Sequence, residues 1–307
     1  MAVEHGAVPS PPVETIRTVA IIGLGLMGGS LGLGLKRRRP DLRVLGQARR
    51  QETIDDGKAS GMIDEGSVNP ADILAEADLT ILCVPIKVTI DFAVENADVW
   101  RRGAIVTDVG SVKGAIVDGA RPPLQARGVH FIGSHPMAGT EKSSLYNAKA
   151  DLYDDAVVFL TEVEADSDSA IATVGAFWES LGMEPHRMPP GPHDMLVART
   201  SHVLHLLSFA AARAYLADPG KSVLATGGGF RDFTRIAASS PDMWTQVFRH
   251  NIGNVLAALE EFQGEIDSVR DMLQDGRWEE MWDYLAESRD SRSAWFDQWQ
   301  QRRGNES

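Results

Sequence analysis

The stretch "VAIIGLGLMGGSLGLGL", residues 19–35, decides the fold. It runs from an apolar, β-branched segment through three glycines spaced GxGxxG into residues that can form a helix. In such a strand-turn-helix the first glycine allows a tight turn, the second lets the backbone approach a pyrophosphate, and the third lets the helix pack on the strand. The helix N-terminus offers N–H groups to the phosphates. The pattern predicts a dinucleotide-binding turn, and glycine-rich packing without a ligand is the alternative. The residues expected to contact the dinucleotide are Gly23, Gly25, Leu26, Met27 and Gly28.

Short apolar runs alternate with stretches of helical composition from residue 18 to about residue 190. These runs suit strands buried on both faces of a sheet. The alternation predicts an α/β domain over 18–190 with a doubly wound, Rossmann-type parallel sheet. Residues 1–17 are polar and contain proline, without the apolar core of a signal peptide, and are expected to form a disordered tail. The expected strands are "TVAIIGLG", "LRVLGQ", "LTILCVP", "AIVTDVGS", "VHFIGSH" and "AVVFLTEV".

The second part of the chain, residues 191–307, lacks such runs and is predicted to be an all-α domain for substrate binding and dimerisation. Ser240, Pro241 and Asp242 are typical of a helix start. Apolar residues then recur at steps of three and four up to Gly276, which predicts one helix of about 30 residues. The excess of large apolar residues favours a homodimer interface over a merely thick core.

The composition is that of a soluble globular protein of about two domains, with 307 residues, 43% of them hydrophobic and 24% charged. A net charge of −13 argues against nucleic-acid binding, and the basic run 36–39 is expected to be a solvated helix end. No apolar stretch is expected to approach the roughly 20 residues that span a bilayer. Cys83 is the only cysteine, so we expect a buried thiol and a reducing cytoplasm.

The end of the second expected strand bears on the choice of cofactor. A carboxylate at this point accepts hydrogen bonds from the ribose hydroxyls of NAD. Here Ala48 occupies that place, and Arg49 and Arg50 follow it. Guanidinium groups can hold a 2′-phosphate through charge-assisted bonds, so the sequence favours NADP over NAD. Two arginines on a solvated loop would leave the missing acid unexplained.

Ligands in such sheets bind beyond the carboxyl ends of the strands. Val84 and Lys113 follow two of these ends and are expected to contact the cofactor. Ser111 and His135 are candidates for the reacting centre, because a histidine can act as a base near neutral pH and a hydroxyl can orient a substrate beside it. From spacing alone, a structural histidine at a strand end is an equally good interpretation.

A series of motifs resembles that of the TyrA family, the prephenate and arogenate dehydrogenases. The similarity extends from about residue 18 to 275 and implies oxidative decarboxylation of a cyclohexadienol with transfer of a hydride to the nicotinamide. We expect the single-function form, without a chorismate mutase segment or a regulatory domain. The motifs are "GLGLMGGSLG", "DVGSVK", "SHPMAGTEKS", "HDMLVARTSHVLH" and "GGGFRDFTRIAASSPDMW".

The resemblance implies roles for particular residues. His135 is expected to accept the proton or hydrogen bond of the 4-hydroxyl, and Ser111 to bind the same oxygen. Arg235 is expected to bind a substrate carboxylate. His202 is expected to be structural, and a metal at the histidines is not expected because no cysteine or HExxH pattern supports it. The other expected substrate-binding residues are His193, His205, Thr140, Glu141, Asp232 and Trp244. Glu141 is expected to gate the site or to meet the ammonium of arogenate. Asp232 is expected to orient Arg235, and Trp244 to line the pocket.

Four questions stay open at this point. Many relatives carry an acid where Ala48 lies and use NAD, and no residue chooses between prephenate and arogenate. A β-hydroxyacid dehydrogenase or imine reductase would need a catalytic lysine in the helical domain, where "HDMLVARTSHVLH" offers histidines. A nucleotide-sensing protein without catalysis would not need Ser111, His135 and Arg235.

Overall fold

The computed structural model describes residues 12–139, 144–163, 167–216, 220, 223–224 and 226–304, with 302–304 as backbone only. The chain divides into two compact units, residues 1–252 and 253–307. The last strand ends at Met188 and a helix begins at Pro190, near the expected change from α/β to all-α structure, so this change falls inside the first unit.

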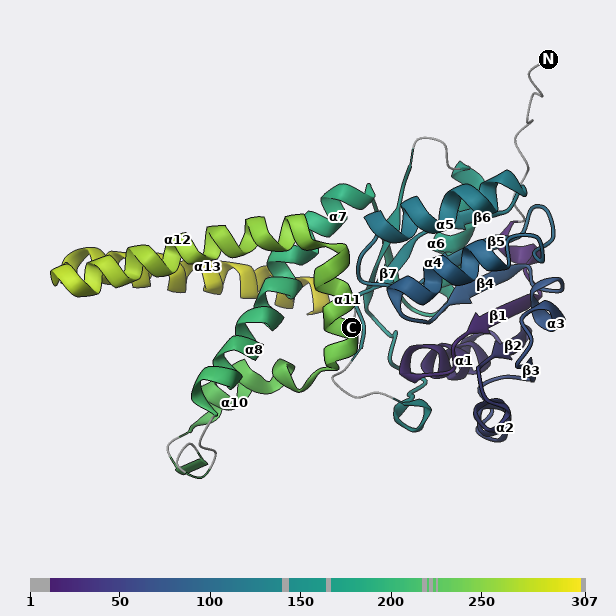
Figure 1. Cartoon of the computed structure of the whole chain (residues 1–307), viewed down its shortest axis with the longest axis horizontal. Coiled ribbons are helices and arrows are strands. Elements are labelled where there is room, and N and C mark those ends of the chain that lie inside the picture. The colour runs from purple at the N-terminus through teal and green to yellow at the C-terminus, as the bar shows by residue number, and fades with distance from the viewer. Residues whose placement is uncertain are drawn as a thin grey trace, which may run out of the picture. The chain divides into compact units, whose positions relative to one another are not determined.

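Six parallel strands form the main sheet of the first unit, in the order β3-β2-β1-β4-β5-β6 (Figure 1). The order reverses between β1 and β4, and ligands bind at such a switch point beyond the carboxyl ends of the strands. The expected doubly wound parallel sheet is confirmed. Its strands are β1 (Thr18–Ile22), β2 (Arg43–Gln47), β3 (Glu65–Ser67), β4 (Leu79–Leu82), β5 (Ile105–Asp108) and β6 (His130–Ile132).

Helices cover both faces of this sheet (Figure 1). Side chains alternate along a strand, so β1 contributes to two cores. Val19 and Ile21 pack with residues of α1 and α6, whereas Ala20 and Ile22 pack with residues of α4 and α5. The helices of this layer are α1 (Leu26–Arg38), α2 (Gln51–Ala59), α3 (Ala71–Leu74), α4 (Ile86–Glu95), α5 (Gly114–Ala126) and α6 (Asp168–Ser180).

A second, three-stranded sheet corrects the prediction for two strands. The run "VHFIGSH" was expected to be one strand, but it divides at Gly133 into β6 and β7 (Ser134–Pro136), which belong to different sheets. The run "AVVFLTEV" forms β8 (Val157–Thr161) in this second sheet, antiparallel to β7. Thr161 binds the Gly133 carbonyl through its N–H at 2.8 Å and its Oγ1 at 3.1 Å, which anchors the crossing between sheets. The third strand, β9 (Glu184–Met188), is polar and was not predicted.

The helical part of the first unit begins with α7 (Pro190–Val197), which continues through a π-helical turn over Ala198–His202 into α8 (Val203–Tyr215). Two short helices follow, α10 (Gly228–Thr234) and α11 (Pro241–His250). The predicted start of α11 is confirmed, since the Ser240 side chain accepts from the N–H of Met243. The single helix expected up to Gly276 is wrong, because it is interrupted at Asn251 and resumes as α12 (Ile252–Asp275).

One continuous helical segment, Pro190–Tyr215, is long and apolar enough to cross a membrane by length and composition. The expectation that no stretch of the chain meets this condition is therefore wrong. The segment carries four buried polar side chains that hydrogen bond within the first unit, His193, Asp194, His202 and Ser208. A core helix of a soluble protein passes the same test of length and composition.

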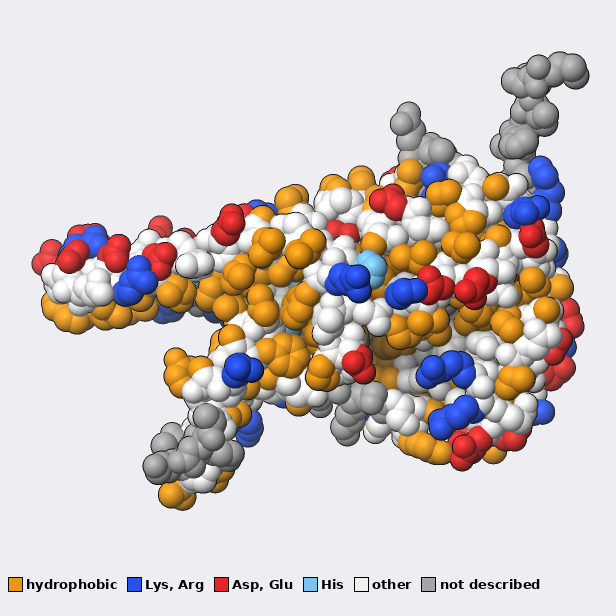
Figure 2. All heavy atoms as spheres, in the orientation of Figure 1, with side chains coloured by type: hydrophobic (Ala, Val, Ile, Leu, Met, Phe, Trp, Pro, Cys, Tyr) orange, Lys and Arg blue, Asp and Glu red, His pale blue; other side chains and the backbone are white. Residues whose placement is uncertain are grey.

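The second unit consists of α12 and α13 (Trp278–Gly304). The chain turns between them at Gly276, whose φ is +67°, and the Tyr284 hydroxyl donates to Glu265 Oε2 at 3.1 Å. Hydrophobic side chains gather along one side of this pair, whereas charged side chains lie mostly along the other (Figure 2). The exposed large apolar residues of the unit are Leu256, Phe262, Ile266, Leu273, Trp278, Trp282, Leu285, Trp295 and Trp299.

Candidate active site

The turn between β1 and α1 has the geometry that its glycines predict. Gly23 has a φ of +94°, where a side chain would be strained, and a Cβ there would lie 2.6 Å from the Cys83 carbonyl oxygen and from Val84 Cγ1. A Cβ on Gly28 would lie 2.0 Å from the Gly23 carbonyl oxygen. Glycine is therefore required at both positions for the helix to approach the strand this closely.

Gly25 differs from the other two glycines, because a Cβ built on it meets no atom within 4 Å. It is the N-cap of α1, so the first N–H groups of the helix, beginning with those of Leu26 and Met27, have no partner within the helix. Open space over unpaired N–H groups and a positive helix end suits a pyrophosphate. The turn therefore fits a dinucleotide.

The carboxyl end of β2 carries the residues predicted to select the nucleotide. Ala48 is buried, whereas Arg49 and Arg50 are exposed at the start of α2. Arg50 is the N-cap residue of that helix. The guanidinium groups thus follow the strand adjacent to β1, on the solvent side of the turn.

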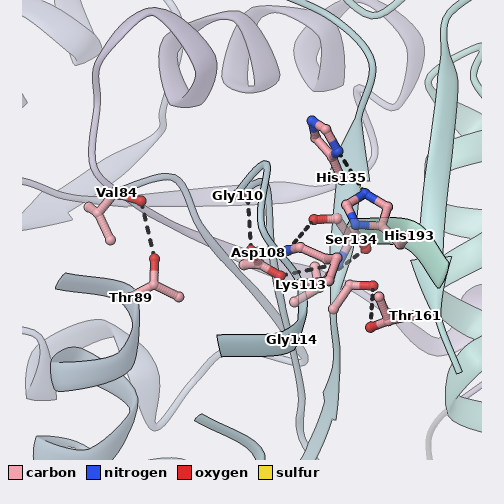
Figure 3. Close-up of polar contacts among 12 residues, drawn as sticks. Val84, Thr89, Asp108, Gly110, Lys113, Gly114, Ser134, His135, Thr161 and His193 are labelled. Atoms are coloured by element: carbon pink, nitrogen blue, oxygen red, sulfur yellow. Dashed lines mark hydrogen bonds and ion pairs between the residues drawn. The ribbon is translucent and has the colours of Figure 1, made fainter. Parts of the chain in front are cut away.

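A buried ion pair lies at the carboxyl end of β5. Lys113 Nζ pairs with Asp108 Oδ2, and both side chains are fully buried. Lys113 Nζ also donates to the Ser134 carbonyl oxygen at 2.8 Å, while Asp108 Oδ1 accepts from the Ser134 N–H at 3.1 Å (Figure 3). Lys113 was predicted to contact the cofactor. Its ammonium faces Asp108 and the backbone of β7, and it fixes the strand that carries His135.

His135 lies next to this pair, on β7, and belongs to a chain of hydrogen bonds. Its Nδ1 is 2.9 Å from His193 Nε2, and His193 Nδ1 is 2.8 Å from Asp194 Oδ1. Asp194 Oδ1 accepts from the N–H of Lys113 at 2.7 Å, and its Oδ2 accepts from the N–H of Gly114 at 2.8 Å. The side chains of α7 are thereby tied to the first turn of α5. His135 is 9% exposed, and His193 is completely buried.

Burial lowers the pKa of both histidines. For His135 the pKa is well below the ordinary value of 6.5, and the nearby charges of His193, Lys113 and His202 lower it further. The hydrogen bond that His193 makes to Asp194 acts in the opposite direction and raises the pKa of His193. Both rings are therefore neutral near neutral pH, which leaves lone pairs available to accept hydrogen bonds.

Of the remaining residues of the two strand-end motifs, the structure describes Ser111 and the segment that follows His135 as far as Gly139. Ser111 is half-buried in the loop between β5 and α5. A Cβ built on Gly139 would lie 3.9 Å from Met27 Sδ, so the loop after His135 reaches the first turn of α1. Thr140 and Glu141, which were predicted to bind substrate, lie outside the described residues.

The predicted residues of the helical part form a second cluster. His205 stacks on Trp244, with ring centroids 3.7 Å apart, and the positive charge of Arg235 contributes to lowering the pKa of His205 after burial. Arg235 is exposed and starts a 3-10 turn. Asp232 pairs with its neighbour Arg231, with 3.1 Å between Arg231 Nε and Asp232 Oδ1.

His202 and Asn251 connect this cluster to the hydrogen-bond chain of His135. Asn251 Nδ2 donates to the Asp194 carbonyl oxygen at 2.8 Å and lies 3.1 Å from His202 Nδ1. Among the described residues, the buried Nε2 of His202 and Nε1 of Trp244 are polar atoms without a hydrogen-bond partner. In the described part of the chain, no group of three or more His, Cys, Asp or Glu side chains is arranged to hold a metal.

Three residues of this arrangement were missed by sequence reasoning: Asp108, Asp194 and Asn251. The signal for two of them was present, because Asp108 ends a buried strand and Asp194 directly follows His193. Asn251 had no such signal, since it lies within what looked like a continuous amphipathic helix.

Comparisons with known proteins agree with this geometry. The chain matches the family model for the nucleotide-binding domain of prephenate dehydrogenase over residues 31–185 and the model for its dimerization domain over residues 189–287. It is 31% identical to prephenate dehydrogenase of Bacillus subtilis over 281 residues, which cover 90% of this chain and 75% of that protein.

Two solved structures are similar over almost their whole length. Prephenate dehydrogenase from Aquifex aeolicus, in complex with hydroxyphenyl propionate and NAD+, has a TM-score of 0.84 and 32% identity, covering 91% of this chain and 98% of that one. Arogenate dehydrogenase from Synechocystis has a TM-score of 0.77 and 27% identity, covering 91% of this chain and 100% of that one.

Proposed function

Because the chain belongs to the prephenate dehydrogenase family, we propose that it converts prephenate to 4-hydroxyphenylpyruvate, arogenate to tyrosine, or both, with hydride transfer to NADP in tyrosine biosynthesis. In this reaction hydride leaves the ring carbon that bears the 4-hydroxyl, and loss of carbon dioxide makes the ring aromatic. The observation that carries the proposal is the state of His135, a neutral ring on β7 held through Nδ1 by His193, in a strand whose following loop reaches the first turn of α1 at Gly139.

The nucleotide-binding domain match and the NAD+ bound in the Aquifex aeolicus complex support a nicotinamide cofactor. When bound, this group supplies the hydride acceptor. Gly23, Gly25 and Gly28 would hold its pyrophosphate with the N-terminus of α1, and Val84, which lies against the turn, would contact it. Lys113 is a further proposed cofactor contact, and its ammonium also fixes β7.

NADP is the preferred nucleotide in this proposal. Ala48 offers no carboxylate that would repel a 2′-phosphate, and Arg49 and Arg50 expose their side chains at the same strand end. An Ala48→Asp variant is expected to lose affinity for NADP by about 10-fold or more, because the new carboxylate repels the 2′-phosphate. The same variant should gain affinity for NAD, because the carboxylate can accept hydrogen bonds from the free ribose hydroxyls. Equal affinities for NADP in the variant and the parent would contradict this assignment.

His135 accepts the proton of the 4-hydroxyl as that oxygen becomes carbonyl-like, and Ser111 binds the same oxygen. Arg235 binds a substrate carboxylate, supported by Asp232, while His205 and Trp244 line the pocket through their stacked rings. The remaining proposed contacts are His193 behind His135, Thr140, and Glu141, which would meet the ammonium of arogenate.

The domain roles follow from the same family. We assign 18–190 to the dinucleotide and 191–307 to substrate binding and dimerisation, as the match to a dimerization domain supports. The exposed apolar side of α12 and α13 is the surface we expect a second copy to cover. A cytoplasmic location is part of the proposal.

The residue assignments are tested by two variants. His135→Asn should lower kcat by about 10²- to 10⁴-fold, the usual contribution of a general base, while the Kd of NADP stays within about 2-fold. Arg235→Gln should raise the KM of the substrate about 10- to 100-fold, because it removes a hydrogen bond to a charged group. His186→Asn, which changes an exposed histidine of β9, is the control. Wild-type turnover in His135→Asn would refute the role of that residue.

A further inference from the structure

The hydrogen-bond chain behind His135 determines which of its ring nitrogens carries the proton. We propose that Asp194 is a positioning residue that acts through His193, holding His135 with its proton on Nδ1 and with Nε2 as the acceptor; this rests on the proposed function.

The chain begins at Asp194, whose oxygens can only accept. Both face backbone donors, because Oδ1 accepts from the N–H of Lys113 at 2.7 Å and Oδ2 from the N–H of Gly114 at 2.8 Å. These donors belong to the first turn of α5, where a helix end favours negative charge. A ring nitrogen 2.8 Å from Oδ1 must therefore donate, so His193 carries its proton on Nδ1.

The tautomer of His193 then fixes that of His135. A neutral imidazole with a proton on Nδ1 has a lone pair on Nε2. His193 Nε2 lies 2.9 Å from His135 Nδ1, so His135 must donate through Nδ1. Its Nε2 consequently carries a lone pair. Burial lowers the pKa of both rings, which keeps them neutral and the chain of donors unambiguous.

The orientation of the rings agrees with this assignment. The second nitrogen of His135 points away from His193 (Figure 3). The two rings meet edge to face, with centroids 5.1 Å apart and an interplanar angle of 76°, and Phe159 packs on His193 with centroids 5.6 Å apart. His193 has no exposed surface, whereas His135 keeps some. The accepting nitrogen is thus on the ring that a substrate can reach.

The same chain assists the reaction after the proton arrives. The hydroxyl O–H bond breaks, an N–H bond forms at His135 Nε2, and the ring becomes cationic. The cation lies near the ammonium of Lys113, whose charge disfavours it. The carboxylate of Asp194, reached through His193, is the negative group that offsets this charge, while Asp108 is already paired with Lys113.

Asp194→Asn tests the proposal, because an amide cannot replace both oxygens. If its nitrogen faces His193, the chain of donors reverses and His135 carries its proton on Nε2. If its nitrogen faces Gly114, two N–H groups oppose each other. We expect kcat to fall by about 10²- to 10⁴-fold, as for other wrong-tautomer variants, with the KM of the substrate within about 3-fold.

His193→Phe is the second variant, because it breaks the chain without removing the bonds of Asp194 to α5, and it should lose kcat to a similar extent. Glu184→Gln is the matched control, since Glu184 pairs with His186 at 2.6 Å on the exposed strand β9. Its kcat should equal that of the parent. Thermal melting of each variant separates loss of fold from loss of positioning.

The direct readout is the ¹⁵N NMR spectrum of the full-length protein with labelled histidine, which distinguishes the tautomers without any turnover. The proposal predicts that His135 is protonated on Nδ1 in the parent and that folded His193→Phe loses this preference, because no acceptor then faces Nδ1. Protonation on Nε2 in the parent, or parent-like kcat in folded His193→Phe, would overturn it. A protein inactive with every substrate but with His135 protonated on Nδ1 would contradict the proposed function alone.

Discussion

The buried pair of Lys113 and Asp108 makes a quantitative prediction about stability. In Lys113→Met the carboxylate of Asp108 stays buried without its cation, and the Ser134 carbonyl oxygen loses a donor at 2.8 Å. Breaking a buried ion pair from one side costs about 3–5 kcal/mol. Asp108 keeps two backbone donors, the N–H groups of Gly110 at 2.8 Å and Ser134 at 3.1 Å. The loss should therefore be near the lower end, about 3 kcal/mol.

Urea denaturation followed by tryptophan fluorescence measures this loss, because the buried Trp178 donates to Ser134 Oγ at 3.1 Å and reports on the same strand. The double variant Asp108→Asn with Lys113→Met removes both charges and should recover at least half of the loss. Lys87→Met is the control, because Lys87 pairs with Asp91 on the exposed face of α4 and should cost less than about 1 kcal/mol. A loss below about 1 kcal/mol in Lys113→Met, or additive losses in the double variant, would refute the reasoning.

Three further predictions concern the turn, the helical part and the second unit. Gly28→Ala should weaken NADP binding at least about 10-fold in calorimetry, because its Cβ would lie 2.0 Å from the Gly23 carbonyl oxygen and displace α1 from β1; unchanged affinity would be inconsistent with this packing. Burial lowers the pKa of His202 from 6.5 to about 4, so between these two values the unfolded chain binds a proton that the folded chain excludes. The free energy of unfolding therefore decreases as the pH is lowered below 6.5. This histidine should remove about 2 kcal/mol of stability between pH 8 and pH 5, and His202→Gln should show a correspondingly shallower fall in denaturation curves; parallel curves would count against it. The double variant Trp282→Asp with Leu285→Asp should convert a dimer into a monomer in light scattering, because both apolar side chains of α13 are more than half exposed. A dimer of unchanged stability would show that this surface is not the dimer interface.

Five strands of the main sheet could be predicted from the sequence because they are largely buried and the turn after β1 needs glycine for steric reasons, whereas the short strand β3, with Glu65 exposed, was not predicted. Gly23 and Gly28 allow no other residue at this packing distance, so the local sequence contains the constraint. The second sheet could not be predicted in the same way. Its strand β9 has exposed side chains at His186 and Arg187, and the division of the run at Gly133 depends on Thr161, which is distant in the sequence.

The site shows the same contrast. His135 was identified by its motif, but the residues that orient it come from two other elements and meet it only in three dimensions. The carboxylate of Asp194 accepts hydrogen bonds from α5 and from His193. Its backbone carbonyl accepts one from Asn251. That last contact also explains why the expected long helix is interrupted at Asn251, since periodicity alone contains no information about a tertiary hydrogen bond.

The most direct test of the central claim is a steady-state assay of the purified protein with prephenate or arogenate, each with NAD or NADP, followed by the absorbance of the reduced nicotinamide. We predict reduction of NADP with at least one of the two substrates, and a lower kcat/KM with NAD. No reduced nicotinamide in any of the four combinations would contradict the proposed activity, and a higher kcat/KM with NAD would contradict the role given to Arg49 and Arg50.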